Sequence, residues 1–164
     1  SRPGFFDGVG TVVTKLLIQA LPDLAIFGEK DYQQLLVIKR LTRDLDIPVE
    51  IIGAPTIRGA DGLAVSSRNV FLSQTNRETA SKVFEILKKT ATAISLGNDL
   101  LAACKEARTE LILAGFSEID YFEARHSETL ELIHNFENNG RLFAAVWLGS
   151  TRLIDNLEIK EYTD

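Results

Sequence analysis

One short stretch, residues 28–34, combines a glycine, charged side chains and amides in an order that suits anion binding. It reads GEKDYQQ and follows an apolar run at 24–27. Leucine and isoleucine then recur at helix spacing, so the pattern predicts a strand, a turn and a helix from about residue 31 to 45. Lys30 and the backbone N–H groups of the first helical turn would then offer an anion site where a strand ends. Alone, the heptapeptide also fits a solvated surface turn.

A second polar segment, residues 55–72, is too long for an ordinary connection, and loops of this length are usually functional or disordered. Its Asp-Gly pair at 61–62 marks a turn. Ser66, Ser67 and Arg68 supply two hydroxyls and a guanidinium close together, which suits phosphate oxygens. Taken alone, this Ser-Ser-Arg run fits an ordinary polar loop as well.

The elements that would position these segments alternate between helix and strand. After a loop at 1–10, apolar spacing predicts a helix at 11–21, and strands are expected at 24–27 and 49–53. This order is typical of a parallel α/β sheet, so both polar segments would emerge at the same sheet edge. Two strands are few for an open sheet, because such a sheet needs neighbouring strands and covering layers.

The rest of the chain predicts an α+β arrangement. Thr75 and Glu78 have the spacing of a capping box, so a helix should begin there and end at Gly97. A second helix is expected at 99–114. Three antiparallel strands should follow, at 119–124, 142–148 and 150–157. We therefore expect a domain boundary at residue 55, with domains at 1–55 and 56–164.

Composition limits the classes of partner. The 164 residues are 45% hydrophobic and 25% charged, as in ordinary globular proteins, and their net charge is −5. Neither nucleic acid nor an anionic membrane attracts an acidic chain, so neither is expected as a partner. The single cysteine, Cys104, excludes an internal disulfide and fits a reducing, cytoplasmic compartment. His126 and His134 lack neighbours at metal-ligand spacing, so no metal site is expected.

Four ordered motifs make the chain similar to a known family. GEKDYQQ at 28–34 and DGLAVSSRN at 61–69 resemble two signatures of the pantothenate synthetase (pantoate–β-alanine ligase) family. RPGFFDGV at 2–9 and AAVWLGSTRLIDN at 144–156 resemble two more. Any one motif would be a weak signal, but four at compatible spacing along the whole chain are a strong one.

The resemblance implies a fold. Residues 1–55 would be the C-terminal remainder of a Rossmann-like, class I nucleotidyltransferase domain with a parallel sheet. Residues 56–164 would be a small α+β lid domain with a three-stranded antiparallel sheet. If the boundary is a hinge, the lid would bring residues 66–68 over the nucleotide and shut water away from a hydrolysable intermediate.

Two features depart from the family pattern. Phe5 stands where the family usually has His, so a polar role at that position is lost or moved. The family's H-x-G-H motif, which contacts the nucleotide, does not occur in these residues, and neither His126 nor His134 matches it. We therefore expect the chain to be the C-terminal part of the enzyme and inactive alone.

The resemblance also implies an activity and roles for individual residues. The family joins pantoate and β-alanine to pantothenate, with ATP and Mg²⁺, through a pantoyl adenylate. This is a cytoplasmic step of coenzyme A biosynthesis, and the full-length protein would be a homodimer. Lys30 would contact a phosphate in the transition state, while Ser66, Ser67 and Arg68 would grip the phosphates and the leaving pyrophosphate.

The remaining roles concern the nucleoside and pantoate. Gly28 and Asp31 would meet the ribose, and Gln34 would donate a hydrogen bond to pantoate. Ile57 and Val65 would pack near adenine, and Mg²⁺ would be carried by the phosphates with few or no protein ligands. Two rivals stay open: a non-catalytic nucleotide-binding or subunit-interaction module, favoured by the lack of H-x-G-H, and a nucleotidyltransferase acting on another acid.

Overall fold

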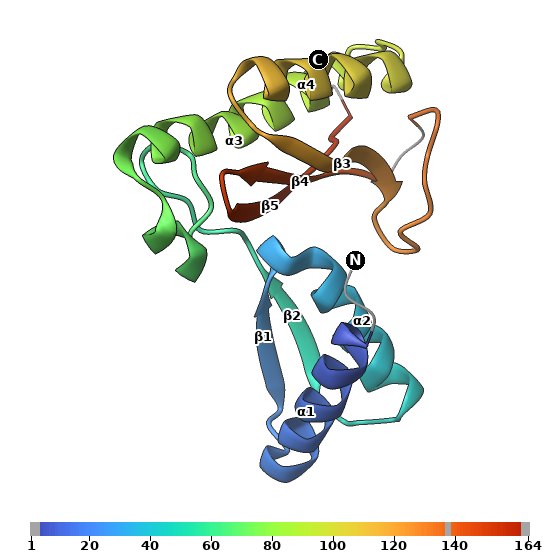
Figure 1. Cartoon of the computed structure of the whole chain (residues 1–164). Coiled ribbons are helices and arrows are strands. Elements are labelled where there is room, and N and C mark those ends of the chain that lie inside the picture. The colour runs from blue at the N-terminus through green and yellow to red at the C-terminus, as the bar shows by residue number, and fades with distance from the viewer. Residues whose placement is uncertain (1–3, 137–138, 162–164) are drawn as a thin grey trace. The chain divides into compact units, whose positions relative to one another are not determined.

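The computed structural model describes residues 4–136 and 139–161. The chain divides into two compact units, Ser1–Thr56 and Ile57–Asp164, which we call unit 1 and unit 2 (Figure 1). Arg2 and Pro3 of the opening RPGFFDGV motif lie outside the described residues.

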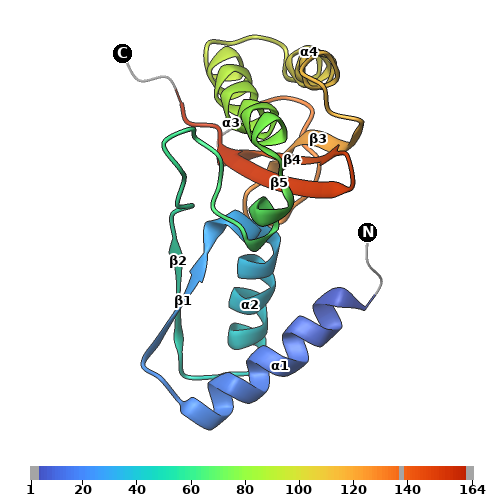
Figure 2. The same cartoon turned by 60° about the vertical axis from the view of Figure 1, so that its left-hand side comes forward.

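Unit 1 is a two-stranded parallel sheet with two helices. Its elements are α1 (Phe5–Ala20), β1 (Leu24–Gly28), a 3₁₀ turn (Glu29–Asp31), α2 (Tyr32–Asp44) and β2 (Glu50–Ala54). β1 and β2 pair in parallel, with Leu24 opposite Glu50 and Gly28 opposite Ala54. Both helices lie on the same side of the strands (Figure 2). A small apolar cluster of Leu17, Ile47 and Val49 lies between the layers.

The start of α1 corrects a prediction. We expected a loop over 1–10, but the helix begins at Phe5, six residues before the predicted start at Thr11. The glycines within 1–10 do not break it. A Cβ on Gly10 would lie only 3.3 Å from Leu41 Cδ1, so the missing side chain allows α1 to approach α2 closely. Tertiary packing therefore overrides the helix-breaking tendency of glycine.

Unit 2 is an antiparallel sheet covered on one face by two helices. Its elements are a 3₁₀ helix (Ser67–Phe71), α3 (Gln74–Ser95), α4 (Leu100–Leu113), β3 (Glu118–His126), β4 (Gly140–Leu148) and β5 (Thr151–Glu158). The strand order is β3-β4-β5, and both pairings are antiparallel. α3 and α4 pack on one face (Figure 1, Figure 2), and the core takes side chains from both helices and all three strands.

The predicted fold class, a partial parallel sheet followed by a three-stranded antiparallel sheet, is confirmed. The predicted cap of α3 is wrong. Ser73, not Thr75, is the N-cap, because its Oγ accepts a hydrogen bond from the Asn76 N–H at 3.1 Å. Among the described residues, none of the helices has the length and apolar character that a membrane span requires.

Candidate functional site

The predicted site residues are divided between the two units. In unit 1 they lie where β1 ends. Gly28 is the last residue of β1 and keeps an extended backbone (φ −72°, ψ 134°). One 3₁₀ turn, Glu29–Asp31, follows, and α2 begins at Tyr32. The strand, turn and helix predicted from GEKDYQQ are therefore present.

Lys30 and Asp31 place opposite charges side by side at the start of α2. The Lys30 Nζ lies 4.0 Å from the Asp31 Oδ2, and the two side chains are 15% and 53% exposed. Asp31 is the N-cap residue of α2, yet its side chain makes no capping hydrogen bond. Its carboxylate oxygens are therefore not used to cap the helix. Gln34 lies half-buried in the first turn of α2.

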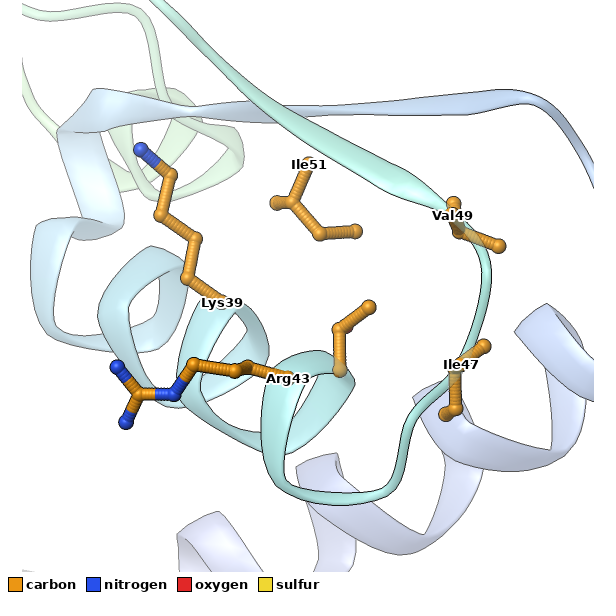
Figure 3. A pocket seen from close by; sticks show the side chains of 6 residues that line it. Lys39, Arg43, Ile47, Val49 and Ile51 are labelled. Atoms are coloured by element: carbon orange, nitrogen blue, oxygen red, sulfur yellow. The ribbon is translucent and has the colours of Figure 1, made fainter.

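A shallow depression in unit 1 lies apart from these residues. It has a volume of about 240 Å³ and is lined by Lys39, Thr42 and Arg43 of α2 together with Ile47, Val49 and Ile51. Figure 3 shows the two cationic side chains on the helix, Ile47 and Val49 on the segment leading into β2, and Ile51 on β2 itself. None of the predicted site residues lines this depression.

In unit 2, the segment from Ile57 to Val65 folds back on itself. The Val65 N–H donates to the Ile57 carbonyl, and the Gly59 N–H donates to the Leu63 carbonyl, both at 2.9 Å. This pairing brings Ile57 and Val65 together, and their side chains are 73% and 58% exposed. The two residues predicted to pack near adenine thus form one exposed apolar pair.

The Ser-Ser-Arg run follows this pair directly. The Ser66 Oγ accepts a hydrogen bond from the Arg68 N–H at 3.3 Å and so caps the 3₁₀ helix Ser67–Phe71. The hydroxyl proton of Ser66 can still be donated. Ser67 and Arg68 are exposed, and within the part of the chain that the structure describes the Arg68 guanidinium makes no hydrogen bond or ion pair.

Sequence reasoning missed the side chains that hold this loop. Arg58 pairs with Asp155 of β5, which lies 97 positions away. Arg77 of α3 donates from Nε to the Asp61 Oδ2 at 2.8 Å. Partial desolvation alone would raise the pKa of Asp61, but hydrogen bonds from the Leu63 N–H and Arg77 bring it below its ordinary value. The Asp-Gly turn signal pointed to this region, and Asp155 lies within the motif at 144–156, but neither pattern shows that Asp155 pairs with Arg58.

Each unit offers a different chemistry. Unit 1 presents an ammonium and a carboxylate beside a helix N-terminus, which suit a phosphate and a hydroxyl group. Unit 2 presents two hydroxyls and a guanidinium beside an apolar pair, which suit phosphate oxygens and a flat apolar ring. No group of three or more His, Cys, Asp or Glu side chains able to hold a metal ion occurs among the described residues. Burial raises the pKa of the Cys104 thiol to about 11, so little of it is thiolate near neutral pH.

Comparison with known proteins gives a consistent result. The family model described as Pantoate-beta-alanine ligase matches residues 1–158. A pantothenate synthetase from Mesorhizobium japonicum is 56% identical over 158 residues, which cover 96% of this chain and 56% of that protein. The chain therefore spans a little over half the length of that relative.

Solved structures show the same similarity. The crystal structure of pantothenate synthetase from Thermus thermophilus matches with a TM-score of 0.92 at 42% identity, over 96% of this chain and 57% of that one. The structure of pantoate-beta-alanine ligase from Francisella tularensis complexed with beta-gamma ATP and beta-alanine matches with a TM-score of 0.73 at 36% identity. That match covers 96% of this chain and 52% of the other.

Proposed function

The chain belongs to the pantoate–β-alanine ligase family, and on that premise we propose that it supplies part of the site that joins pantoate to β-alanine with cleavage of ATP. The proposed activity is that of a whole protein, which in the full-length form would be a homodimer. Within it, residues 1–55 would belong to the nucleotide-binding domain and residues 56–164 would act as the lid.

The proposed reaction has two steps. The pantoate carboxylate attacks the α-phosphorus of ATP, pyrophosphate leaves, and pantoyl adenylate forms. The β-alanine amine then attacks the acyl carbon, and AMP leaves. Negative charge shifts onto phosphate oxygens in both steps, so fixed cations and hydrogen-bond donors would lower both barriers.

Unit 1 would hold the phosphate and the ribose. The Lys30 ammonium is mostly shielded from solvent, so its charge would act on a phosphate with little screening. A Cβ added at Gly28 would have no neighbouring atom of the protein within 4 Å, so packing within the protein does not require a glycine there. The open space beside Gly28 supports close approach of a ligand to the backbone. Asp31 would accept from ribose hydroxyls, and the neutral amide of Gln34 would donate to pantoate without repelling its carboxylate.

Unit 2 would hold the adenine and the phosphate tail. Ile57 and Val65 would contact the base. Ser66, Ser67 and Arg68 would donate to the phosphates and to the departing pyrophosphate. Mg²⁺ would enter on the triphosphate, since this ion usually keeps several waters and is held largely by substrate phosphates.

One observation carries the proposal. The exposed Ile57–Val65 pair is followed directly in the sequence by the 66–68 turn. The Arg68 guanidinium of that turn makes no hydrogen bond or ion pair among the described residues. An apolar pair followed by hydroxyls and a cation has the order in which a nucleotide presents its base and its phosphates.

Pantoate-dependent exchange of pyrophosphate into ATP tests the proposal. We expect exchange by the longest product of the reading frame that encodes this chain, and none by the 164 residues alone, which do not include H-x-G-H. Lys30→Ala or Arg68→Ala in the longer product should slow exchange on the order of 10²-fold or more. Lys39→Ala, a cation elsewhere in α2, is the matched control and should leave the rate unchanged.

Each opposite result has a definite meaning. Exchange by the 164 residues alone would overturn the requirement for H-x-G-H. Unchanged exchange in Arg68→Ala would remove the lid from the mechanism. A longer product that exchanges with a different acid but not with pantoate would replace the proposed substrate.

A further inference from the structure

The loop that carries the Ile57–Val65 pair is held by a largely buried ion pair, Arg58–Asp155, in addition to the more exposed Arg77–Asp61 pair. The Arg58 Nη1 donates to the Asp155 Oδ2 at 2.6 Å, and the Nη2 donates to the Oδ1 at 2.9 Å. Their side chains are 15% and 6% exposed. The Asp155 Oδ1 also accepts from the Asn156 N–H at 2.8 Å. Both carboxylate oxygens are therefore bonded, and the bidentate geometry fixes the guanidinium in position and orientation.

The same guanidinium contacts two further elements. Its carbon lies 3.6 Å from the ring centroid of Phe84 on α3, and the Nη1 also donates to the Gly62 carbonyl at 3.2 Å. The Phe84 ring lies beneath the turn, since a Cβ on Gly62 would come within 3.1 Å of it. One side chain thus joins the loop to α3 and to β5.

The position of Arg58 determines what this anchor controls. Arg58 forms an isolated antiparallel bridge with Ala64, so it lies one residue after Ile57 and faces the residue before Val65. Asn69 adds a second tie, because its Nδ2 donates to the Ala64 carbonyl at 3.0 Å. An Arg58 held in place therefore also holds the exposed Ile57–Val65 pair and the start of the 66–68 turn in place.

We propose that Arg58 and Asp155 are positioning residues, whose ion pair holds residues 57–68 in the geometry that binds the nucleotide. This inference rests on the proposed function. A buried ion pair is weak evidence for stability, because well-packed apolar side chains can replace one without loss, so geometric definition is the better account of its presence. Lysine could not substitute for Arg58, since it offers neither a bidentate contact nor a planar group to stack on Phe84.

The test compares variants of this pair with variants of another Arg–Asp pair that also includes a residue of β5. Arg152 and Asp120 join β5 to β3 through an Nε–Oδ2 contact of 2.6 Å. Neither residue has a hydrogen bond or ion pair to the 57–69 loop among the described residues. The test variants are Arg58→Lys, Asp155→Asn and Phe84→Leu, and the controls are Arg152→Lys and Asp120→Asn. All are made in the longest product of the reading frame.

Steady-state exchange kinetics give the first readout. We expect Arg58→Lys and Asp155→Asn to raise the KM for ATP and lower kcat on the order of 10- to 100-fold, with the KM for pantoate unchanged. Phe84→Leu, which loses only the stacked ring, should give a smaller change of the same kind. The controls should keep wild-type values. A purely structural role would reduce the amount of folded enzyme without changing the KM for ATP.

Amide hydrogen exchange gives a readout independent of catalysis. In Arg58→Lys the amides of Gly59, Gly62 and Val65 should exchange faster, while those of the β4–β5 ladder keep wild-type rates. Wild-type loop exchange, or a wild-type KM for ATP in both Arg58→Lys and Asp155→Asn, would overturn the proposal. If the parent protein shows no pantoate-dependent exchange, the proposed function fails, and the loop amides then decide separately whether Arg58 orders the loop.

Discussion

The two units differ in how much of their own sheet they cover. In unit 2, α3 and α4 cover one face of three strands, and the core includes Leu87, Leu111 and Leu142, all fully buried. In unit 1, the strands are covered on the helix side, but Leu24 and Ile26 of β1 remain 48% and 63% exposed. Burial of apolar area is the main source of stability. The Ser-Ser-Arg turn therefore belongs to a unit with its own apolar core, whereas Lys30 belongs to a unit that buries little apolar area.

Separating the units would test this contrast most strongly. Residues 57–164 expressed alone should unfold in one cooperative thermal transition, because their core lies within the fragment. Residues 1–56 expressed alone should show no cooperative transition, because two strands with one covered face are marginal. Circular dichroism and calorimetry measure both. A cooperative transition in the 1–56 fragment would contradict the contrast.

Single truncations sharpen the same contrast. Leu142→Ala removes a fully buried side chain of β4 and should lower the free energy of unfolding of unit 2 by about 2–5 kcal/mol. Ile26→Ala removes an exposed side chain of β1 and should cost about 1 kcal/mol or less. Urea denaturation of the intact chain measures both. Equal losses at the two positions would mean that the exposed face of β1 is covered in solution.

The helices of the two units also show how far the sequence could predict the fold. The sequence predicted a helix that ends at Gly97, and Val83, Ile86 and Leu87, which recur in it at helical spacing, all lie in the core. Helical spacing failed at the start of α1, because the packing of Gly10 on Leu41 is a tertiary effect. The capping pattern also chose Thr75 where Ser73 makes the bond, since both residue types suit an N-cap and only the backbone geometry decides.

For the candidate site, the sequence located side chains but not what holds them. The motifs pointed to Lys30 and Arg68 because charged and hydroxyl groups beside glycines have a local signature. Arg58 lies outside the four motifs, and Asp155 lies in the 144–156 motif with no sign of its partner, because only the fold joins the two residues. Support of this kind depends on pairing between distant segments, which a single sequence does not reveal.

A pair of glycine substitutions tests how far the rigid packing of unit 2 extends into its loop. Gly62 and Gly97 both have left-handed φ values, +80° and +91°, so alanine is strained at either position. A Cβ at Gly97 would meet nothing within 4 Å, whereas one at Gly62 would lie 3.1 Å from Phe84. Gly97→Ala should cost about 1 kcal/mol and Gly62→Ala about 2–3 kcal/mol, measured by urea denaturation. Equal costs would mean that Phe84 moves aside freely.

The smallest expected effect concerns acid and the Arg152–Asp120 pair of unit 2. The hydrogen bond from Arg152 holds the pKa of Asp120 below its ordinary value near 3.8, and the Trp147 Nε1 contributes a second bond. Because the folded pKa is the lower one, the carboxylate stabilises unit 2 above the unfolded pKa, and this stability is lost as the pH falls through the folded value. Asp120→Asn should therefore cost about 0.2–1 kcal/mol at pH 7, as for a partly exposed pair.

Titrating wild type and Asp120→Asn side by side isolates this charge from packing. The two free energies of unfolding should converge as the pH is lowered from about 5 toward about 2, because the wild-type carboxyl becomes neutral there as the amide always is. Added salt at pH 7 should narrow the difference in the same direction, since it screens the partly exposed pair. If the difference in free energy of unfolding between wild type and Asp120→Asn stays constant across the titration, the loss of stability comes from the shape of the side chain and not from its charge. In that case the acid sensitivity of unit 2 would have to come from other carboxylates, such as Asp61 in the 57–65 loop, whose pKa is also lowered.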